Sequence, residues 1–499
     1  MFLKVLEFQT KKNQYILDGV TGSVFAVDDI ILDCLKLYEQ ENNFDYVLGI
    51  LKDKYTDENK IKAAIKFVKK YSEYGAFYIN IDNEKRKRNR GSVFNENEVK
   101  KILSAGYTQQ IILNITENCN MRCKYCYFSD TYKYTNNRND NMMNAKTAIK
   151  ALDYFFDIIE QISEFNPGKK CGITFYGGEA LLNFSIIKTC IEYSKKVCPV
   201  TPIFNITTNG TMLYGDIADY LVENDVYITI SLDGSKNQHD RNRIDAIGKG
   251  TFDRIINNIK NFKHKYPNYY KINLSSVYDY STDMEENNKF FTRHKDLPIV
   301  GMVTPVVERG TNYYKKFSDQ QIDEFVKKFN AVRDEYISNK IDNKAMNSYL
   351  EILFDLIIAG VITKLRADDK RLPILPYTST CIPGMKLFVR TDGRLDICER
   401  INGSMSIGDI ETGLDIKKVS NIIKKYNKNV TNQCYKCPIN RQCGVCFAQL
   451  CEDGNFAKPD CEKLIQIYKM ALSIAYTILE QNSHAFDNFL YRDEWIFNS

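Results

Sequence analysis

Short runs of alternating hydrophobic and polar residues open the chain and predict a small sheet. Three runs are expected strands: Phe2–Gln9, Gln14–Asp18 and Ser23–Val27. Apolar residues at helical spacing then predict three helices: Asp28–Tyr38, Phe44–Tyr55 and Asp57–Tyr71. Three strands followed by three helices indicate a winged-helix-like module at residues 1–80.

The pattern changes over residues 106–310, where short apolar runs alternate with helical stretches. The expected strands are Ile111–Ile115, Gly172–Tyr176, Ile203–Thr207, Tyr227–Ser231, Lys271–Ser276 and Ile299–Thr304. Long crossovers between consecutive strands are typical of parallel α/β folds. We therefore expect either an open sheet or a partial barrel here.

Polar or irregular segments flank this region. Residues 81–105 include the basic run 85–90 and are expected to be a solvated linker. Residues 311–370 form a helical insert, because Ser318 and Gln321 make a capping-box sequence before an amphipathic run. Residues 371–470 show few regular patterns. A final helix is expected at Cys461–Gln481, and residues 471–499 form the C-terminal helix and tail.

Composition and net charge limit the kinds of molecule that the protein is expected to bind. The 499 residues favour two to four domains, and the formal net charge is only +5 from 68 basic and 63 acidic residues. This balance disfavours nucleic acid or an anionic membrane as the main partner. The first residues lack a secretory signal, and the apolar stretch Tyr349–Ile362 is interrupted by two carboxylates. We expect a cytoplasmic protein that does not span a membrane.

The chain has 15 cysteines, and their distribution is uneven. Three lie between 119 and 126, and eight lie between 381 and 461. In a reducing compartment, clustered thiols are more often metal ligands than disulfides. The remaining four, Cys34, Cys171, Cys190 and Cys198, are expected to be buried or incidental thiols.

The first group has the spacing CxxxCxxC, at Cys119, Cys123 and Cys126, directly after an expected strand. Three thiolates can hold three irons of a cubane cluster and leave the fourth iron open to a small molecule. A structural zinc site normally needs four ligands, and no fourth cysteine is nearby. An iron–sulfur cluster is the better interpretation.

This motif resembles the radical S-adenosylmethionine (SAM) superfamily, which also favours an aromatic residue at the position of Tyr125. The resemblance implies a partial (β/α)6 TIM-type barrel with a [4Fe–4S] cluster whose open iron is chelated by SAM. One electron then cleaves SAM to a 5′-deoxyadenosyl radical, which abstracts hydrogen from the substrate. Such chemistry requires an enclosed, dry cavity.

Other motifs follow the expected strands. Gly177 and Gly178 allow close backbone approach to the ligand, and the adjacent Glu179 can pair with the ammonium of SAM. The resemblance also implies SAM contacts from Ser231 first and Arg243 second. These residues fall at or after the C-terminal ends of expected strands, where barrel enzymes build their active sites.

Four further polar residues lie near these motifs, and three of them have two interpretations. Asn209, Asp233 and Asp240 are either SAM contacts or parts of turns and salt bridges, whereas His239 is interpreted as structural.

The second cysteine group resembles the SPASM domain, which carries two auxiliary [4Fe–4S] clusters; zinc ribbons are the chemical alternative. The resemblance assigns Cys381, Cys398 and Cys446 to the first auxiliary cluster. The resemblance assigns the remaining family positions to the second auxiliary cluster: Cys434, Cys437, Cys443 and Cys461.

The spacing of this group departs from the family pattern in one place. Cys443 and Cys446 are separated by two residues instead of three, and Cys451 is an additional thiol. Cys451 either completes the first auxiliary cluster or leaves an open iron there. Glu399 occupies the position at which sulfatase-maturing relatives carry a proposed aspartate base, and it is the candidate catalytic residue.

The front module, with Tyr15–Gly19 and Thr21–Asp29, resembles the recognition element of ribosomally made, post-translationally modified peptides (RiPPs). That element binds a leader peptide by adding it as a strand to a sheet edge. A winged-helix DNA-binding module is the rival, but no basic recognition helix is present.

These resemblances imply a peptide maturase that forms a crosslink, most plausibly a thioether from a substrate cysteine to a carbon. Its partners would be a precursor peptide and a reductant such as flavodoxin or ferredoxin. Three alternatives stay open. They are a sulfatase-type maturase that makes formylglycine without needing residues 1–80, a carbon–carbon crosslinking or epimerising maturase, and a non-catalytic zinc-binding regulator.

Overall fold

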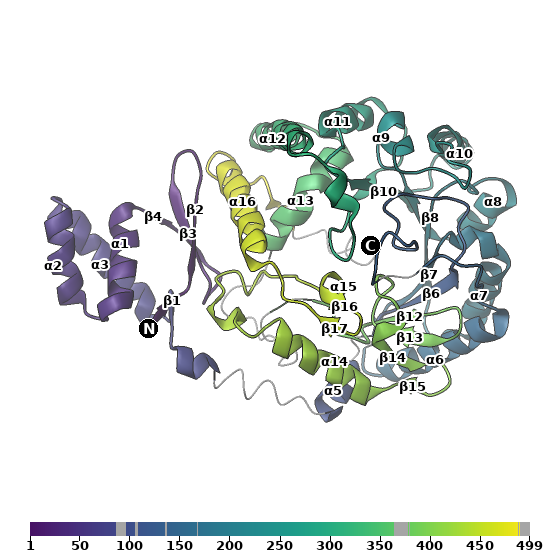
Figure 1. Ribbon diagram of the computed structural model, residues 1–499, viewed down its shortest axis with the longest axis horizontal. Coiled ribbons are helices and arrows are strands. Elements are labelled where there is room, and N and C mark those ends of the chain that lie inside the picture. Colours follow the sequence, from purple (N-terminus) through teal and green to yellow (C-terminus); the bar gives the residue numbers. More distant parts are fainter. Residues whose placement is uncertain are drawn as a thin grey trace.

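Six parallel strands in chain order form the centre of the computed structural model (Figure 1). They are β6 (Gln110–Thr116), β7 (Cys171–Gly177), β8 (Pro202–Thr208), β9 (Tyr227–Ser231), β10 (Ile272–Tyr278) and β11 (Val300–Pro305). Every neighbouring pair among them is parallel, and β6 and β11 do not pair with each other. The six expected strands are confirmed to within two residues at each end.

The structure describes residues 1–85, 96–104, 108–134, 137–166, 168–363, 378, 380–487 and 489. Most of the basic run, part of the expected linker, the junction at 364–377 and most of the C-terminal tail lie outside these residues.

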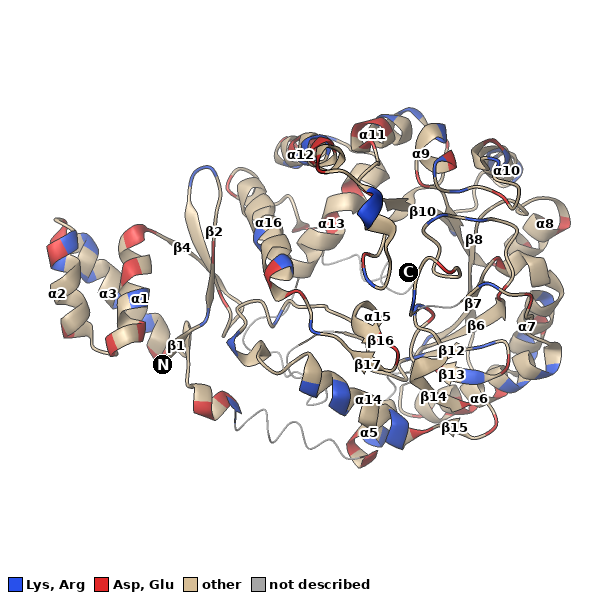
Figure 2. Cartoon of the chain, viewed as in Figure 1, with Lys and Arg blue, Asp and Glu red and all other residues tan. Residues whose placement is uncertain are grey.

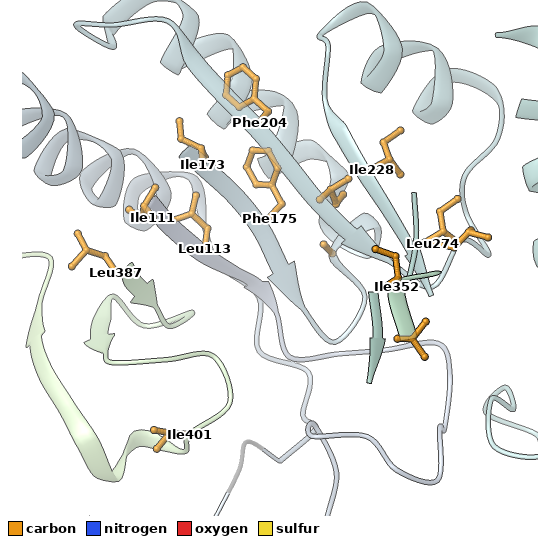
Figure 3. Close-up of a cluster of buried hydrophobic side chains, with 14 of the residues drawn as sticks. Ile111, Leu113, Ile173, Phe175, Phe204, Ile228, Leu274, Ile352, Leu387 and Ile401 are labelled. Carbon is orange, nitrogen blue, oxygen red and sulfur yellow. The ribbon is translucent and has the colours of Figure 1, made fainter. Parts of the chain in front are cut away.

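Helices on the crossovers pack against the parallel strands. These helices are α6 (Ala145–Ser163), α7 (Phe184–Val197), α8 (Gly215–Glu223), α9 (Lys236–Asp240), α10 (Phe252–Lys265) and α11 (Met284–Arg293). Ile111, Ile173, Phe175 and Ile228 belong to the large buried core (Figure 3). Buried and partly exposed positions alternate along β8, β9 and β10, whereas β6 is buried at nearly every position. These burial patterns require short apolar or alternating runs, which explains why the sequence located the strands.

The helical insert is confirmed as two helices, α12 (Asp319–Ile341) and α13 (Ser348–Ile362). Ser318 and Gln321 form the expected capping box at the start of α12. Helix α13 is the apolar stretch noted above, and it packs against β11 as part of the core. In the described part of the chain, no helix is both long enough and apolar enough to span a bilayer.

The cysteine-rich region has more regular structure than its sequence indicated. β12 (Lys386–Val389) extends the barrel sheet by pairing in parallel with β6. The antiparallel strands β13 (Arg394–Asp396), β14 (Ser406–Asp409) and β15 (Gly413–Leu414) continue it. These strands are two to four residues long, too short for a clear alternating pattern.

Three helices and one β-hairpin follow β15, and the last helix confirms the expected final helix. They are α14 (Ile416–Asn429), α15 (Phe447–Leu450), the hairpin of β16 (Cys451–Glu452) and β17 (Asn455–Phe456), and α16 (Cys461–Leu479).

Part of the expected linker is folded, which corrects the prediction for residues 81–105. Glu96–Ile102 form helix α5, which packs against α14. Its Val99 is completely buried in the main core. Ile102 and Leu103 pack into the same core. The surrounding polar residues hid these few apolar contacts from the sequence pattern.

The front module contains the expected strands and helices, together with the additional short strand β5. Its strands are β1 (Phe2–Leu3), β2 (Val5–Gln9), β3 (Gln14–Asp18), β4 (Val24–Val27) and β5 (Tyr78–Ile79). Its helices are α1 (Asp29–Glu41), α2 (Phe44–Lys54) and α3 (Glu58–Glu73). The expected first strand is divided at Lys4, because β1 pairs with β5 while β2 pairs with β3. The winged-helix assignment stays a prediction.

Both faces of the three-stranded sheet β2-β3-β4 are covered. Ile16 packs among helices α1–α3, whereas its neighbour Leu17 faces Ile439 and Leu472 of the cysteine-rich region and α16. This alternation places the front module directly against the C-terminal part of the chain, beside α16 in Figure 1. Basic and acidic residues are interspersed along the helices, in keeping with the near-balanced charge (Figure 2).

Three of the four isolated cysteines, Cys34, Cys171 and Cys190, are buried as expected. Cys198 is partly exposed, and its sulfur lies 3.4 Å from that of Cys171.

Candidate functional site

The three cysteines of the first group lie on one loop after β6, here called the cysteine loop (Cys119–Cys126). Backbone N–H groups point at two of their sulfurs. The N–H of Met121 lies 3.4 Å from Cys119 Sγ, and that of Phe128 lies 3.3 Å from Cys126 Sγ. Donors placed in this way stabilise sulfur that carries negative charge.

Side chains from two other strand ends add donors to the same sulfurs. Arg243 Nη1 lies 3.9 Å from Cys123 Sγ, and Asn209 Nδ2 lies 4.0 Å from Cys119 Sγ. Burial raises the pKa of the Cys123 thiol to about 12 and that of Cys119 to about 11. Only a bound metal would keep such buried thiols ionised, and the surrounding donors fit a cluster of negatively charged sulfurs.

The described residues contain no group of three or more His, Cys, Asp or Glu side chains arranged to hold a metal ion. The assignment of a cluster to the cysteine loop therefore depends on the chemistry of its donors and on their neighbours.

The two glycines at the end of β7 lie against the cysteine loop itself. A Cβ atom on Gly178 would overlap the carbonyl oxygen of Asn118, and one on Gly177, where φ is +139°, would overlap that of Thr116. The N–H of Gly178 donates to Thr116 O at 2.8 Å. The sequence indicated close approach to a ligand, but the structure shows close approach to the loop that carries the cysteines.

Glu179 joins three segments of the site. Its buried carboxylate accepts hydrogen bonds from Thr208 Oγ1 at 2.7 Å, from the N–H of Asn209 at 2.7 Å and from that of Leu181 at 3.1 Å. Its own N–H donates to Asn118 O at 2.9 Å. Burial raises the pKa of Glu179, and the hydrogen bonds oppose this shift. The carboxylate thus joins the end of β7 to the end of β8, and the backbone N–H joins it to Asn118, just before the cysteine loop. A contact of Glu179 with SAM stays a prediction.

Asp233 is the centre of a buried charged network. Arg243 Nε donates to one of its carboxylate oxygens at 3.0 Å, and the hydroxyl of Tyr125 donates to the other. The Arg243 guanidinium also lies 5.5 Å from the centroid of the Tyr125 ring. Asp233 therefore forms the salt bridge that one interpretation expected, and it positions both an arginine and an aromatic residue at the cysteine loop. A contact with SAM stays a prediction.

The other candidates at the strand ends have different surroundings. Asn209 Nδ2 donates to Asn120 Oδ1 at 2.8 Å, so this side chain braces the cysteine loop. Asp240 forms an ion pair with Lys236 at 3.1 Å and caps the start of α10. Ser231 ends β9 and is partly exposed; a contact with SAM stays a prediction.

Sequence reasoning missed Asp279, which follows β10. Its carboxylate accepts two hydrogen bonds of 2.7 Å from Arg241, one of 2.6 Å from the Tyr313 hydroxyl and one of 3.1 Å from Asn242. These bonds fix the segment that follows α9 against the end of β10. An acidic residue just after a predicted parallel strand was the available signal.

The three cysteines that the sequence assigned to the first auxiliary site differ in exposure. Cys381 is exposed, whereas Cys398 and Cys446 are partly buried. Burial raises the pKa of the Cys398 thiol and that of the Cys446 thiol. Their role as ligands of one cluster stays a prediction.

The cysteines of the expected second auxiliary set also differ in exposure. Cys443 is buried, Cys434 and Cys437 are partly buried, and Cys461 is exposed. Burial raises the pKa of Cys437 to about 11. Their role as ligands of a second auxiliary cluster stays a prediction.

Cys451 is placed apart from these contacts. It is buried, its sulfur is 4.0 Å from Ser404 Oγ, and it lines a cavity together with Arg309. Its place in a cluster stays a prediction.

That cavity lies between the two cysteine groups. Its walls include Tyr127, Tyr132 and Tyr134 from the segment after Cys126, together with Arg400. The Arg400 guanidinium lies 5.8 Å from the centroid of the Tyr127 ring. Glu399 Oε2 is 3.3 Å from Cys398 Sγ, so this carboxylate lies beside the first auxiliary set.

Comparison with known proteins identifies the class. Residues 113–286 match the sequence model of the radical SAM superfamily, a range that includes all three cysteines of the loop. The S-adenosylmethionine-dependent nucleotide dehydratase of Flammeovirga pacifica is 30% identical over 244 residues, which cover 46% of this chain and 72% of that enzyme. The chain therefore belongs to the radical SAM superfamily and is an enzyme. Membership implies a [4Fe–4S] cluster and SAM.

Two further similarities extend beyond the barrel. The cysteine-type anaerobic sulfatase-maturating enzyme of Clostridium novyi (strain NT) is 27% identical over 363 residues, which cover 69% of this chain and 86% of that enzyme. The structure of native anSMEcpe with bound AdoMet and Kp18Cys peptide covers 77% of this chain and 98% of its own. Its TM-score is 0.54 at 19% identity, which shows that the two share a fold.

We predict that Gly178→Ala impairs cluster loading, because the new methyl group displaces Asn118 and with it the start of the cysteine loop. The strain should cost about 1–3 kcal/mol. Iron content and iron–sulfur absorbance after anaerobic reconstitution measure the effect. The matched control is Gly49→Ala in α2, where nothing lies within 4 Å of the added Cβ. Normal iron content in Gly178→Ala would contradict the steric argument.

Because His239 is buried, we predict that the protein loses stability in mild acid. Its ring is buried, its Nδ1 accepts from the N–H of Asp233 at 3.4 Å, and burial lowers its pKa from 6.5 to about 3. As pH falls below 6.5 the unfolded chain binds a proton that the folded chain excludes, so the free energy of unfolding decreases by about 1.4 kcal/mol per pH unit.

The free energy of unfolding at pH 7 and pH 5 tests this prediction. Between pH 7 and pH 5, the free energy of unfolding of the unmodified chain should fall by about 2 kcal/mol because of His239 alone. His239→Gln should show a smaller fall, whereas His264→Gln, at an exposed position, should behave like the unmodified chain. Equal pH dependence in all three proteins would show that His239 does not carry the effect.

Proposed function

We propose that this enzyme is a peptide maturase that joins a substrate cysteine to a carbon atom through a thioether. One observation carries the proposal. The cavity between the two cysteine groups is lined both by residues that follow Cys126 and by Arg400, which follows the first auxiliary set. A substrate residue in this cavity would lie between the proposed source of the 5′-deoxyadenosyl radical and the proposed auxiliary clusters, which could accept an electron.

The front module would bind the leader of a precursor peptide as a RiPP recognition element. In the described part of the chain, β4 pairs only with β3, so its outer edge is available for another strand. Phe25 of β4 packs against Phe67 and Tyr71 of α3, and Ala26 is exposed. An extended peptide added to this edge would gain main-chain hydrogen bonds.

The cysteine loop would hold the [4Fe–4S] cluster through Cys119, Cys123 and Cys126. When bound, the cluster and SAM supply a reductively generated 5′-deoxyadenosyl radical. Reduced flavodoxin or ferredoxin is the proposed donor of the electron.

Protein groups around the loop would then position SAM. Arg243, held by Asp233, places a guanidinium at the cysteine loop, where it would meet the carboxylate of SAM. Glu179, Asn209 and Ser231 lie at neighbouring strand ends and would line the rest of the SAM site.

The second group would hold two auxiliary [4Fe–4S] clusters. Cys381, Cys398 and Cys446, with or without Cys451, would form the first, and the set around Cys437 would form the second. Closing a thioether removes two hydrogens from the peptide. One leaves as an atom to the 5′-deoxyadenosyl radical, the other as a proton from the thiol, and one electron passes to an auxiliary cluster. Glu399, whose Oε2 is 3.3 Å from Cys398 Sγ, would accept the proton.

Formylglycine formation is the second candidate function. The 27% identity to a cysteine-type sulfatase-maturating enzyme, which this chain covers to 86%, favours it. The products differ chemically. A thioether retains the sulfur and removes two hydrogens, whereas formylglycine formation from cysteine removes the sulfur and creates an aldehyde.

The test is an anaerobic assay of the full chain with SAM, dithionite and a cysteine-containing peptide, chosen as one that a reading frame next to the enzyme's own encodes. We expect a product lighter by two hydrogens whose thiol no longer reacts with an alkylating reagent. A product that loses sulfur and reacts with a hydrazide would support formylglycine formation and contradict thioether formation.

The matched control is Cys123→Ala, which removes one ligand of the proposed SAM-binding cluster. It should lose SAM cleavage and product formation while it retains affinity for the peptide, because the front module lies on the other side of the cysteine-rich region. SAM cleavage at the unmodified rate would contradict the assignment of the cysteine loop.

A further inference from the structure

The turn regions of the front module make a close contact with the loop that contains Cys437. A Cβ atom on Gly19 would lie 2.7 Å from Pro438 Cα, so only glycine permits this approach. Arg441 Nε donates to Val20 O at 2.8 Å. The proposed peptide-recognition module is therefore in direct contact with the proposed second auxiliary set.

Lys4 lies at the centre of this contact. It separates β1 from β2, only 5% of it is exposed, and its N–H donates to Phe77 O at 2.7 Å. Its Cγ lies 3.0 Å from where a Cβ of Gly19 would be, on the side of Gly19 that meets Pro438.

The charges around the ammonium group of Lys4 come from both parts of the interface. Burial lowers the pKa of Lys4 to about 8; Glu84, Cys437 and Asp18 act in the opposite direction, and Arg441 adds to the lowering. The apolar contacts of Leu17, Ile439 and Leu472 also join the two parts of the interface.

We propose that Lys4 is a positioning residue for electron transfer, whose positive charge raises the reduction potential of the auxiliary cluster held by Cys437. The inference builds on the proposed function, which places a cluster there. Through Lys4, the peptide-recognition module would set how readily that cluster accepts an electron.

The physical basis is the charge that the cluster gains on reduction. An added electron interacts favourably with a nearby cation, and partial burial keeps this interaction from being screened. At an effective dielectric constant of about 20, two charges about 10 Å apart change the ratio of oxidised to reduced cluster by roughly tenfold. A tenfold change corresponds to about 59 mV for one electron.

The experiment is a potentiometric titration of the reconstituted full chain, followed by EPR. The signal of the second auxiliary cluster is identified by its loss in Cys437→Ala. Lys4→Met should lower the potential of this signal by about 59 mV, a roughly tenfold change. Lys4→Arg should retain the original potential. Lys11→Met is the matched control, because it removes one charge from an exposed position in the β2–β3 turn.

The outcomes separate the inference from the proposed function. A signal that is present but has the same potential in Lys4→Met and Lys11→Met would overturn the role of Lys4 and leave the clusters intact. If Cys437→Ala loses no iron–sulfur signal, no cluster is held there, and both the auxiliary assignment and the inference fail. Circular dichroism confirms that Lys4→Met and Lys4→Arg are folded.

Discussion

Backbone atoms of β7 and of the cysteine loop meet at a distance that only glycine allows, and the geometry of the site depends on this contact. Gly177 and Gly178 lie against the carbonyl oxygens of Thr116 and Asn118, directly ahead of Cys119. The following residue, Glu179, then hydrogen-bonds to the end of β8. Three strand ends are thereby held at fixed positions around the loop whose sulfurs must bind iron.

Burial of charge is the second constraint. Asp233 and Arg243 are almost completely buried, and each is compensated by the other and by groups of the cysteine loop. Breaking such a pair leaves a charge without a partner in a region of low dielectric constant, which is strongly unfavourable. The same network therefore stabilises the fold and places a cation where the carboxylate of a bound cofactor can use it.

The sequence predicted the six parallel strands because the side of each strand that faces the core produces a short apolar or alternating run. It also located the cysteine loop and the polar strand ends, since these follow the strands directly. It could not predict how Lys4, Gly19 and Pro438 meet, because residues more than 400 positions apart leave no periodic signal. The parallel pairing of β12 with β6 and the hydrogen bonds of Asp279 also join segments that are distant in the sequence, and they were recognised only in the folded chain.

The central claim is that the cysteine loop binds a cluster with one iron that SAM can ligate. The most direct measurement is the EPR spectrum of the reduced, reconstituted enzyme, recorded before and after the addition of SAM. Ligation of the open iron should change the g-values of one cluster signal, and that signal should be absent when Cys119, Cys123 and Cys126 are all replaced by alanine. A spectrum that SAM leaves unchanged, or that survives loss of all three cysteines without alteration, would contradict the claim.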